Sequence, residues 1–249
     1  MSQVDWSALR QALRRCRAAG IETQVWWRDD DAIEVTPELE MLAAQADRMS
    51  LRVHLAVIPA FATQDLASYC HNAPFLPVVH GWAHKDHSGG QGKKNEFQTE
   101  RDDAMGDAER GLSCLQDLFG TALRHMFVPP WNRINQTVIG ALPDLGYTAL
   151  STYGPRQAPE AVPKLAQINT LLDPINWHGG GGLIDPQQLV THAAAHFEDR
   201  ADGRADAHEP YGLLTHHLVH DPSIWTFAID FMTELQMQGA KPWHMESTG

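Results

Sequence analysis

The stretch Val25-Trp26-Trp27-Arg28-Asp29-Asp30-Asp31-Ala32 joins an apolar, strand-like run to three consecutive carboxylates. Neighbouring acids repel one another, and such a cluster costs stability unless a cation, a basic partner or bulk water compensates it. Acidic runs usually face water, but the two indoles that come just before this one argue against an open surface. We therefore expect the acids at the carboxyl end of a buried strand, where α/β proteins build their sites.

Length and composition are those of an ordinary globular chain. The protein has 249 residues, of which 43% are hydrophobic and 20% charged. No domain boundary or internal repeat is visible, so we expect a single domain over residues 1–249. The net charge of -12 disfavours nucleic acid and anionic membranes as partners, because phosphate binding needs clustered lysine and arginine.

The chain carries no visible export or anchoring signal. Residues 4–19 have the spacing of an amphipathic helix with several arginines, and they lack the continuous apolar region of a signal peptide. No run approaches the length of a transmembrane helix. Cys16, Cys70 and Cys114 have no C-x-x-C spacing and are interpreted as buried thiols in a reducing compartment. These observations predict a cytoplasmic protein without membrane insertion.

Strand and helix patterns alternate along the whole chain. The expected strands are 23–28, 51–58, 75–80, 125–128, 147–151, 165–172 and 211–215. The expected helices are 4–19, 37–49, 63–71, 99–119, 137–145, 186–197 and 222–238. Sequential β/α units imply a parallel sheet, and about seven of them favour a barrel or broken barrel over an open sheet. The predicted fold class is therefore α/β, a distorted (β/α) barrel with about seven parallel strands.

Acids, imidazoles and indoles follow five of the seven expected strands. In a β/α barrel these strand ends converge on one face, so the side chains are expected to share a space. The segments are Asp29 to Asp31, His80 to His84, Pro129 to Arg133, Asp173 to Trp177, and Thr215 to His217.

Three His-x-x-x-His pairs occur among the 14 histidines. His192 and His196 fall within an expected amphipathic helix, which favours a structural role. Of the pair at 216 and 220, only the first member is expected to reach the strand end. His80 and His84 follow an apolar strand through a glycine, so one turn of chain could aim both rings at the same ion. Two neutral imidazoles and one carboxylate from the acidic triplet make an open zinc site.

With these motifs in order, the chain resembles the polysaccharide deacetylases of carbohydrate esterase family four. The likeness covers residues 25–220, nearly the whole chain, and the family's distorted (β/α) barrel agrees with the strand count. The segments that carry it are Asp30-Asp31, His80 to His84, Val128-Pro129-Pro130-Trp131, Asp173 to Trp177, and Leu213-Leu214-Thr215-His216.

The resemblance implies a metal-dependent hydrolase that removes an acetyl group from an N-acetylated sugar or a related amide. It makes Asp30 the general base that activates the attacking water and His216 the acid that protonates the leaving amine. It makes Asp31, His80 and His84 the ligands of a divalent metal ion, most simply Zn²⁺. Asp29 could shift the register of the acid pair by one residue, although Arg28-Asp29 matches the Arg-x that divergent family members place before the pair.

The same resemblance implies a substrate pocket for a small-molecule or oligosaccharide substrate. It places Pro130, Trp131, Asn132, Asp173 and Trp177 in that pocket. A main-chain N–H near residues 130–131 would face the developing oxyanion. The two indoles would wall the pocket, and the acid at 173 would hold the catalytic histidine charged.

Two departures from the family pattern stand out. Ala32 replaces the usual glycine after the acid pair, and Val128 replaces the arginine that precedes the proline segment. Arg133 lies five residues later and is a candidate replacement. His87 and His217 are spare imidazoles without an assigned role.

Several readings of the function stay open. Without an export signal, a small acetamido sugar, a glycan precursor or a glycolipid head group is a more plausible substrate than a cell-wall polymer. The same site could hydrolyse another linear or cyclic amide. Two histidines and a carboxylate also form the facial triad of non-heme iron oxygenases. The departures at 32 and 128 make a catalytically inactive carbohydrate-binding barrel a further alternative.

Overall fold

A computed structural model describes residues 4–90 and 92–246. The sheet of the described residues has ten strands. They are β1 (Gln24–Ala32), β2 (Val53–Val57), β3 (Phe75–His80), β4 (Met126–Val128), β5 (Ala149–Leu150), β6 (Glu160–Val162), β7 (Leu165–Gln167), β8 (Thr170–Leu172), β9 (Tyr211–Thr215) and β10 (Lys241–Pro242). The α-helices are α1 (Ser7–Ala18), α2 (Pro37–Arg48), α3 (Gln64–Cys70), α4 (Ala104–Phe119), α5 (Gln136–Ala141), α6 (Pro186–Ala201) and α7 (Pro222–Met237).

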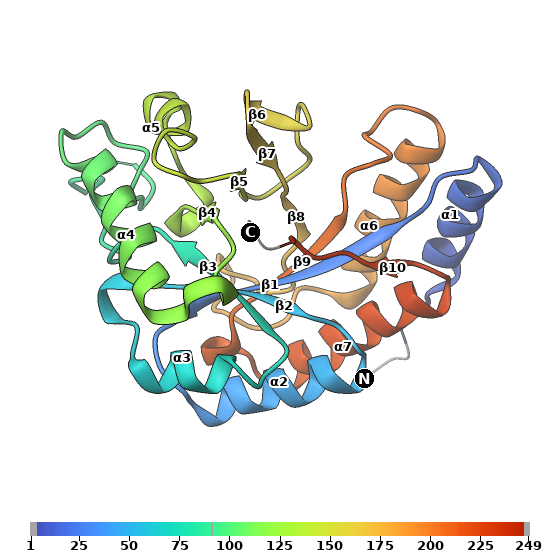
Figure 1. Cartoon of the computed structure of the whole chain (residues 1–249). Helices are drawn as coiled ribbons and strands as arrows, with labels where there is room; N and C mark the ends of the chain where they lie inside the picture. The colour runs from blue at the N-terminus through green and yellow to red at the C-terminus, as the bar shows by residue number, and fades with distance from the viewer. Residues whose placement is uncertain (1–3, 91, 247–249) are drawn as a thin grey trace.

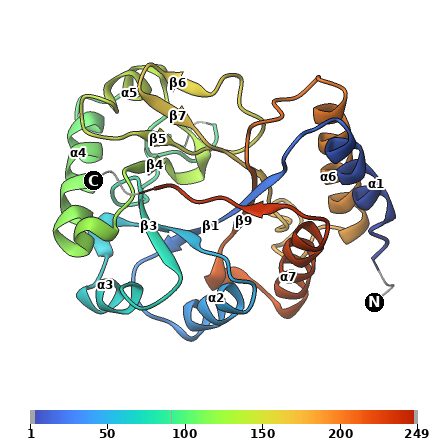
Figure 2. The ribbon, with the colours of Figure 1, turned by 45° about the vertical axis from the view of Figure 1, so that its right-hand side comes forward.

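The strands form a curled sheet with helices around its periphery (Figures 1 and 2). The order is β6-β7-β5-β4-β3-β2-β1-β9-β8, with β10 pairing to β1. All pairs are parallel except β6 with β7. An isolated bridge between Tyr153 and Thr170 joins the chain after β5 to β8. The expected fold class, a distorted (β/α) barrel, is confirmed.

Strand alternation divides the core into two parts. Successive side chains on a strand face opposite sides of the sheet, so Trp26 and Trp27 of β1 enter different clusters. Trp27 packs in the large cluster that contains the helix side chains. Trp26 packs in a smaller cluster on the other face of the sheet, with Ala56, Val78, Met126, Val128, Ala149 and Ile168. Arg28 and Asp30 share the parity of Trp26, and β1 therefore places them on that second face.

Local signals explain most helix starts. Thr36 caps α2 by accepting a hydrogen bond from the Leu39 amide at 3.2 Å, and Pro37 occupies the first helical position. Asp221 caps α7 in the same way. The expected start of the helix 99–119 is wrong, because α4 begins only at Ala104. The amide of Thr99 instead donates to the Asn95 side chain at 2.8 Å.

Two strand boundaries also differ from the expected ones. Strand β1 extends through Asp29, Asp30 and Asp31 rather than ending before them. The expected strand 165–172 is split into β7 and β8, which pair with different neighbours. None of the described helices is long and apolar enough to cross a membrane.

Candidate metal centre

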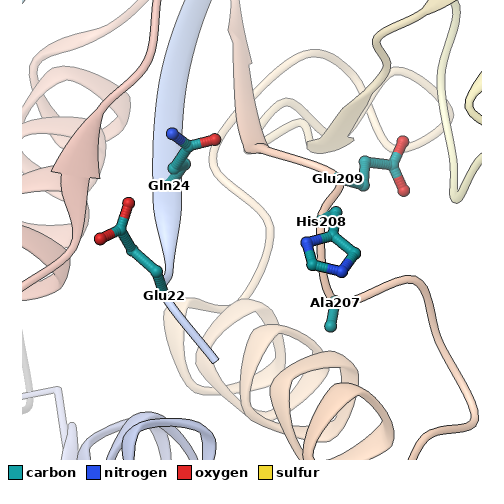
Figure 3. Close-up of a pocket in the computed structure, with 5 residues that line it drawn as sticks. All are labelled: Glu22, Gln24, Ala207, His208 and Glu209. Atoms are coloured by element: carbon teal, nitrogen blue, oxygen red, sulfur yellow. The ribbon is translucent and has the colours of Figure 1, made fainter. Parts of the chain in front are cut away.

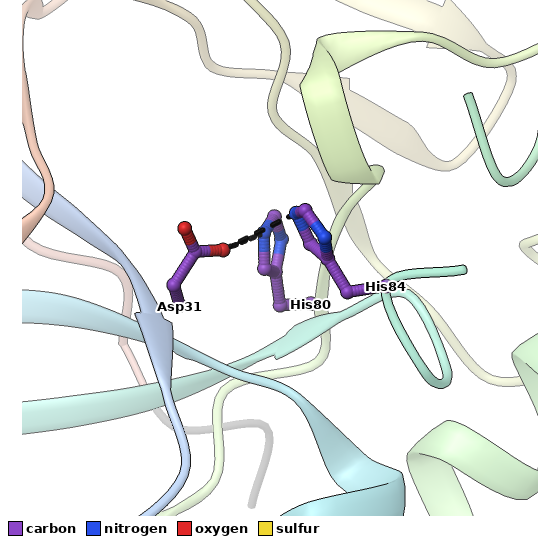
Figure 4. A group of neighbouring side chains, drawn as sticks. All are labelled: Asp31, His80 and His84. Atoms are coloured by element: carbon purple, nitrogen blue, oxygen red, sulfur yellow. Dashed lines mark hydrogen bonds and ion pairs between the residues drawn. The ribbon is translucent and has the colours of Figure 1, made fainter. Parts of the chain in front are cut away.

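Asp31, His80 and His84 gather at the carboxyl ends of β1 and β3 (Figure 4). Asp31 Oδ1 lies 3.1 Å from His80 Nε2 and 3.3 Å from His84 Nε2. Tetrahedral zinc with bonds near 2.0–2.1 Å separates its ligand atoms by about 3.3 Å. The two separations from Asp31 are therefore close to those around one small cation, and all three donor atoms lie within 4.8 Å of one another.

A β-bulge turns Asp31 into the same space as Asp30. Between Asp29 and Ala32, β1 advances three residues while β2 advances two, from Leu55 to Val57. Asp31 takes a positive φ of 78° at this point. A bulge adds one residue to a strand and re-aims the side chains that follow. Two consecutive acids can therefore reach one site, which a regular strand would not allow.

The environment of His80 fixes which ring nitrogen is free. Its Nδ1 lies 3.0 Å from the carbonyl oxygen of Val128, and because a carbonyl only accepts, Nδ1 carries the proton. A neutral His80 then presents the lone pair of Nε2 to a carboxylate oxygen of Asp31. Two acceptors at 3.1 Å repel each other unless a proton or a cation lies between them. This arrangement is typical of metal-binding histidines, whose second nitrogen is held by an acceptor.

The electrostatics of the three groups suit a cation site. Burial alone would raise the pKa of Asp31, but the hydrogen bond and charge of His80, with His216 and His84, hold that pKa well below its usual range. Burial lowers the pKa of His84, and the neighbouring His80 lowers it further. Burial opposes protonation of His80, but Asp30 and Asp31 raise its pKa, so a proton between His80 and Asp31 offsets the repulsion of the two acceptors. Metal binding releases such protons, and a divalent ion would take the place of this one.

Arg28 holds the carboxylate of Asp30 in a buried ion pair. The guanidinium Nη2 donates to Asp30 Oδ2 at 3.0 Å, and both side chains are almost fully buried. The same Nη2 donates to Asn132 Oδ1 at 2.7 Å, and Nη1 donates to Ser151 Oγ at 2.8 Å. The candidate replacement Arg133 instead donates to the carbonyl of Lys94. Arg28, rather than Arg133, is therefore the arginine that contacts Asp30.

Strained backbone is concentrated around these residues. Of six non-glycine residues with positive φ in the described chain, four lie here: Asp31, His84 (51°), Trp131 (55°) and Asn132 (57°). Such conformations cost about 1–3 kcal/mol each and persist only where the surroundings impose them. The Trp131 ring packs against His84 with centroids 4.2 Å apart. The turn after β4 thus brings an indole to the second histidine.

His216, at the end of β9, lies beside Trp177. Their ring centroids are 4.8 Å apart in an edge-on arrangement, and Trp177 is 51% exposed. Asp173 Oδ2 accepts a hydrogen bond from Trp177 Nε1 at 2.8 Å, and Oδ1 accepts one from the Ile175 amide at 2.9 Å. Asp173 therefore holds the indole directly. Burial raises the pKa of Asp173, and the nearby charge of His216 opposes that shift.

Asp29 points away from Asp30 and pairs with His217, one of the spare imidazoles. Asp29 Oδ1 lies 2.5 Å from His217 Nδ1, and Oδ2 accepts from Thr215 Oγ1 at 2.6 Å. Trp27 Nε1 donates to the same threonine hydroxyl at 2.8 Å. This buried cluster ties the turn after β9 to β1. The three acids thus lie in three different environments, and both carboxylate oxygens of Asp29 already have partners in Thr215 and His217.

The other histidine pairs have structural partners. His196 Nε2 accepts from Arg200 Nε at 3.0 Å, within α6. His220 Nε2 accepts from the main-chain amide of His216 at 3.2 Å. A hollow elsewhere on the molecule is lined by Glu22, Gln24, Ala207, His208 and Glu209 (Figure 3). It lies at the amino ends of β1 and β9, at the other end of the strands from His80 and His84.

Sequence reasoning missed Arg28 as a partner of Asp30. The signal for this contact was their spacing, because residues two apart on a strand share a face. A guanidinium beside a carboxylate in a buried strand favours an ion pair. The bulge at Asp31 had no signal of its own in the sequence.

No family model matches the sequence, and no curated protein matches it. Solved structures do match. A peptidoglycan N-acetylglucosamine deacetylase is 12% identical over 89% of this chain and 86% of its own, with a TM-score of 0.55. A family 4 carbohydrate esterase from Streptomyces lividans is 14% identical over 90% and 93%, with a TM-score of 0.55. A family 4 pseudoenzyme from Bacillus anthracis is 15% identical over 89% and 63%, with a TM-score of 0.54. At such low identities, the likeness shows that the chain has the fold of the family 4 carbohydrate esterases.

Proposed function

We propose that this protein is a metal-dependent hydrolase that removes an acetyl group from an N-acetylated sugar or a related amide. The observation that carries the proposal is the convergence of Asp31, His80 and His84 beside Asp30, which Arg28 fixes. The fold shared with carbohydrate deacetylases supports it. Those three residues would hold the ion, and the donor set favours zinc.

A bound divalent ion supplies a Lewis acid, which polarises a carbonyl and brings the pKa of water towards neutrality. Asp30 accepts a proton from the attacking water, and Arg28 keeps its carboxylate turned towards the site. His216 donates a proton to the amine as the carbon–nitrogen bond breaks. Water thus adds to the carbonyl carbon, and the products are acetate and a free amine.

The surrounding residues would bind and orient the substrate. Trp131 and Trp177 flank the site from the turns after β4 and β8, and either indole could stack on a sugar ring. Asp173 keeps Trp177 in place through its hydrogen bond. Pro130 begins the turn that carries Trp131, and Asn132 is engaged by Arg28. A small-molecule or oligosaccharide substrate fits this arrangement, in line with the carbohydrate-acting neighbours.

The test combines metal analysis with acetate release. Protein loaded with zinc is expected to release acetate from small acetamido sugars. Asp30→Asn should keep the metal and lose turnover, whereas His84→Ala should lose the metal. If both variants hydrolyse as well as the parent, the proposal is wrong.

In one alternative, the same site hydrolyses a different linear or cyclic amide. Activity assays on a panel of such amides distinguish this alternative from deacetylation. A second alternative is an inactive carbohydrate-binding barrel, because a pseudoenzyme shares this fold. Zinc-loaded protein that binds acetamido sugars and releases no acetate would favour that alternative.

A further inference from the structure

Neighbouring atoms closely surround the segment between His80 and His84, beginning at Gly81. Gly81 has a φ of +59°, and a Cβ at this position would overlap Glu96 Oε2 and the ring of Pro130. Gly111 of α4 lies near the carbonyl oxygen of Gly81, and a Cβ at position 111 would overlap that oxygen. The loop that presents His84 is therefore built against fixed neighbours.

Glu96 binds the main chain of this loop through its carboxylate. Oε1 accepts hydrogen bonds from the amides of Ala83 at 2.9 Å and Lys85 at 3.4 Å, and Oε2 accepts one from the amide of Trp82 at 3.2 Å. An ionised carboxylate offers only acceptors, which matches three converging N–H groups. The amides of Ala83 and Lys85 flank His84, so the carboxylate holds the loop on both sides of that histidine.

Glu96 is itself held by its neighbours and is 1% exposed. Phe97 is fully buried and packs edge-on against Phe127 of β4, with centroids 5.0 Å apart. Phe97 also forms a bridge with Ile134. The side chain of Asn95 accepts from two main-chain amides that follow it, at 3.0 and 2.8 Å. Phe97 thus anchors this segment to β4 through contacts that do not involve His84.

We propose that Glu96 is a positioning residue that holds His84 at the metal-binding position and so sets the metal affinity of the site. His84 occupies a left-handed conformation that is uncommon outside glycine, and the carboxylate of Glu96 stabilises the turn that imposes it. In the described part of the chain, the Glu96 carboxylate forms hydrogen bonds with main-chain amides and with none of the three donor atoms. The inference rests on the proposed metal centre.

The experiment measures the dissociation constant for zinc by competition with a chromophoric chelator. Glu96→Gln keeps the shape of the side chain but turns an NH₂ group towards the loop amides. Loss of a group that orients a ligand costs about 10–100-fold in metal affinity, and that loss is expected here. Glu209→Gln is the matched control, because Glu209 is also buried and accepts from a main-chain amide, that of Arg156, at 3.2 and 3.3 Å. The control should bind zinc as the parent does.

A double-mutant cycle with His84→Ala identifies the route of the effect, and it is measured by calorimetric titration at high zinc on the weak residual binding of Asp31 and His80. If Glu96 acts through His84, Glu96→Gln has no further effect on zinc affinity in the His84→Ala background. An equal loss in both backgrounds, or parental affinity in Glu96→Gln, overturns the proposal. If circular dichroism shows that Glu96→Gln and Glu96→Asp both fail to fold, the proposal is also overturned, because Glu96 would then serve the fold. A parent that binds no zinc overturns the proposed function as well.

Discussion

Arg28 and Asp30, two residues apart on β1, form a buried ion pair on the face of the strand that meets the candidate metal centre. Arg28 Nε lies 2.9 Å from Asp30 Oδ1, and the side chains are 0% and 3% exposed. Removing one member of a buried pair leaves an unpaired charge and costs about 3–5 kcal/mol. Arg28→Met is therefore expected to destabilise the protein by that amount in urea unfolding and to lower kcat.

Arg133→Met is the control for that variant. Arg133 directly follows the turn Pro130–Asn132 but donates to the carbonyl of Lys94, so its loss should leave kcat close to that of the parent. If Arg133→Met lowers kcat more than Arg28→Met does, Arg28 does not hold the base.

Zinc should stabilise the folded protein against heat and urea. A ligand that binds only the folded state at 100 times its dissociation constant adds about 2.7 kcal/mol. The gain should vanish in His84→Ala, which removes a donor atom. It should persist in His192→Ala, because His192 is exposed on α6. Differential scanning calorimetry with zinc and with a chelator measures both. A gain of equal size in His84→Ala would count against the site.

The Asp29–His217 pair should make stability depend on pH above neutrality. Burial opposes protonation of His217, but Asp29 raises its pKa above the usual 6.5. A pKa raised on folding contributes stability below the unfolded value and loses it as the pH rises through the folded value. The parent should therefore lose stability relative to His217→Asn from about pH 6.5 upwards.

The measurement is urea unfolding of both proteins in chelator between pH 6 and 9. His217→Asn keeps a neutral donor near Asp29, so groups that titrate elsewhere cancel in the difference. A difference that is constant over this range would show that His217 is neutral in the folded protein.

Trp177→Ala should weaken substrate binding. An aromatic contact contributes about 0.5–1.5 kcal/mol beyond its buried area, which corresponds to a rise in KM of roughly two- to tenfold. Trp177→Phe keeps a ring and loses only the hydrogen bond to Asp173, so its KM should lie between those of the parent and the alanine variant. Steady-state kinetics on an acetamido sugar measures both, and an unchanged KM in Trp177→Ala would place the substrate elsewhere.

Much of the fold was predictable because regular periodicity carries it. The strands 75–80 and 211–215 have their expected bounds, and α2 begins at its expected residue, Pro37. The start of α4 was not predictable, because Asn95, rather than the helix, engages the amide of Thr99. That hydrogen bond depends on how residues 95–97 pack on the barrel, which no local pattern encodes.

The grouping of Asp31, His80 and His84 was predictable, but the contacts that hold the surrounding residues in place were not. His80 and His84 stood out by spacing and by their place after a strand, and the structure brings them to Asp31. Asp173 was expected to hold His216 charged; the hydrogen bonds that its oxygens accept from Trp177 and the amide of Ile175 were not foreseen. Glu96 lies between the expected strand 75–80 and the expected helix 99–119, where the sequence predicts no regular element. Contacts between residues distant in sequence decide these roles, so they become visible only in three dimensions.

The bulge at Asp31 bears on how relatives of this chain should be aligned. Three consecutive acids offer two overlapping pairs, and a residue-by-residue alignment can match either pair to the acids of another protein. The extra residue in β1 separates the possibilities: Asp29 is committed to His217, and the second pair faces His80. An alignment gap placed before Asp29 rather than after it would shift both acids by one position. Arg28 is a sounder anchor for alignment than the acids, because its ion pair marks the residue two positions later.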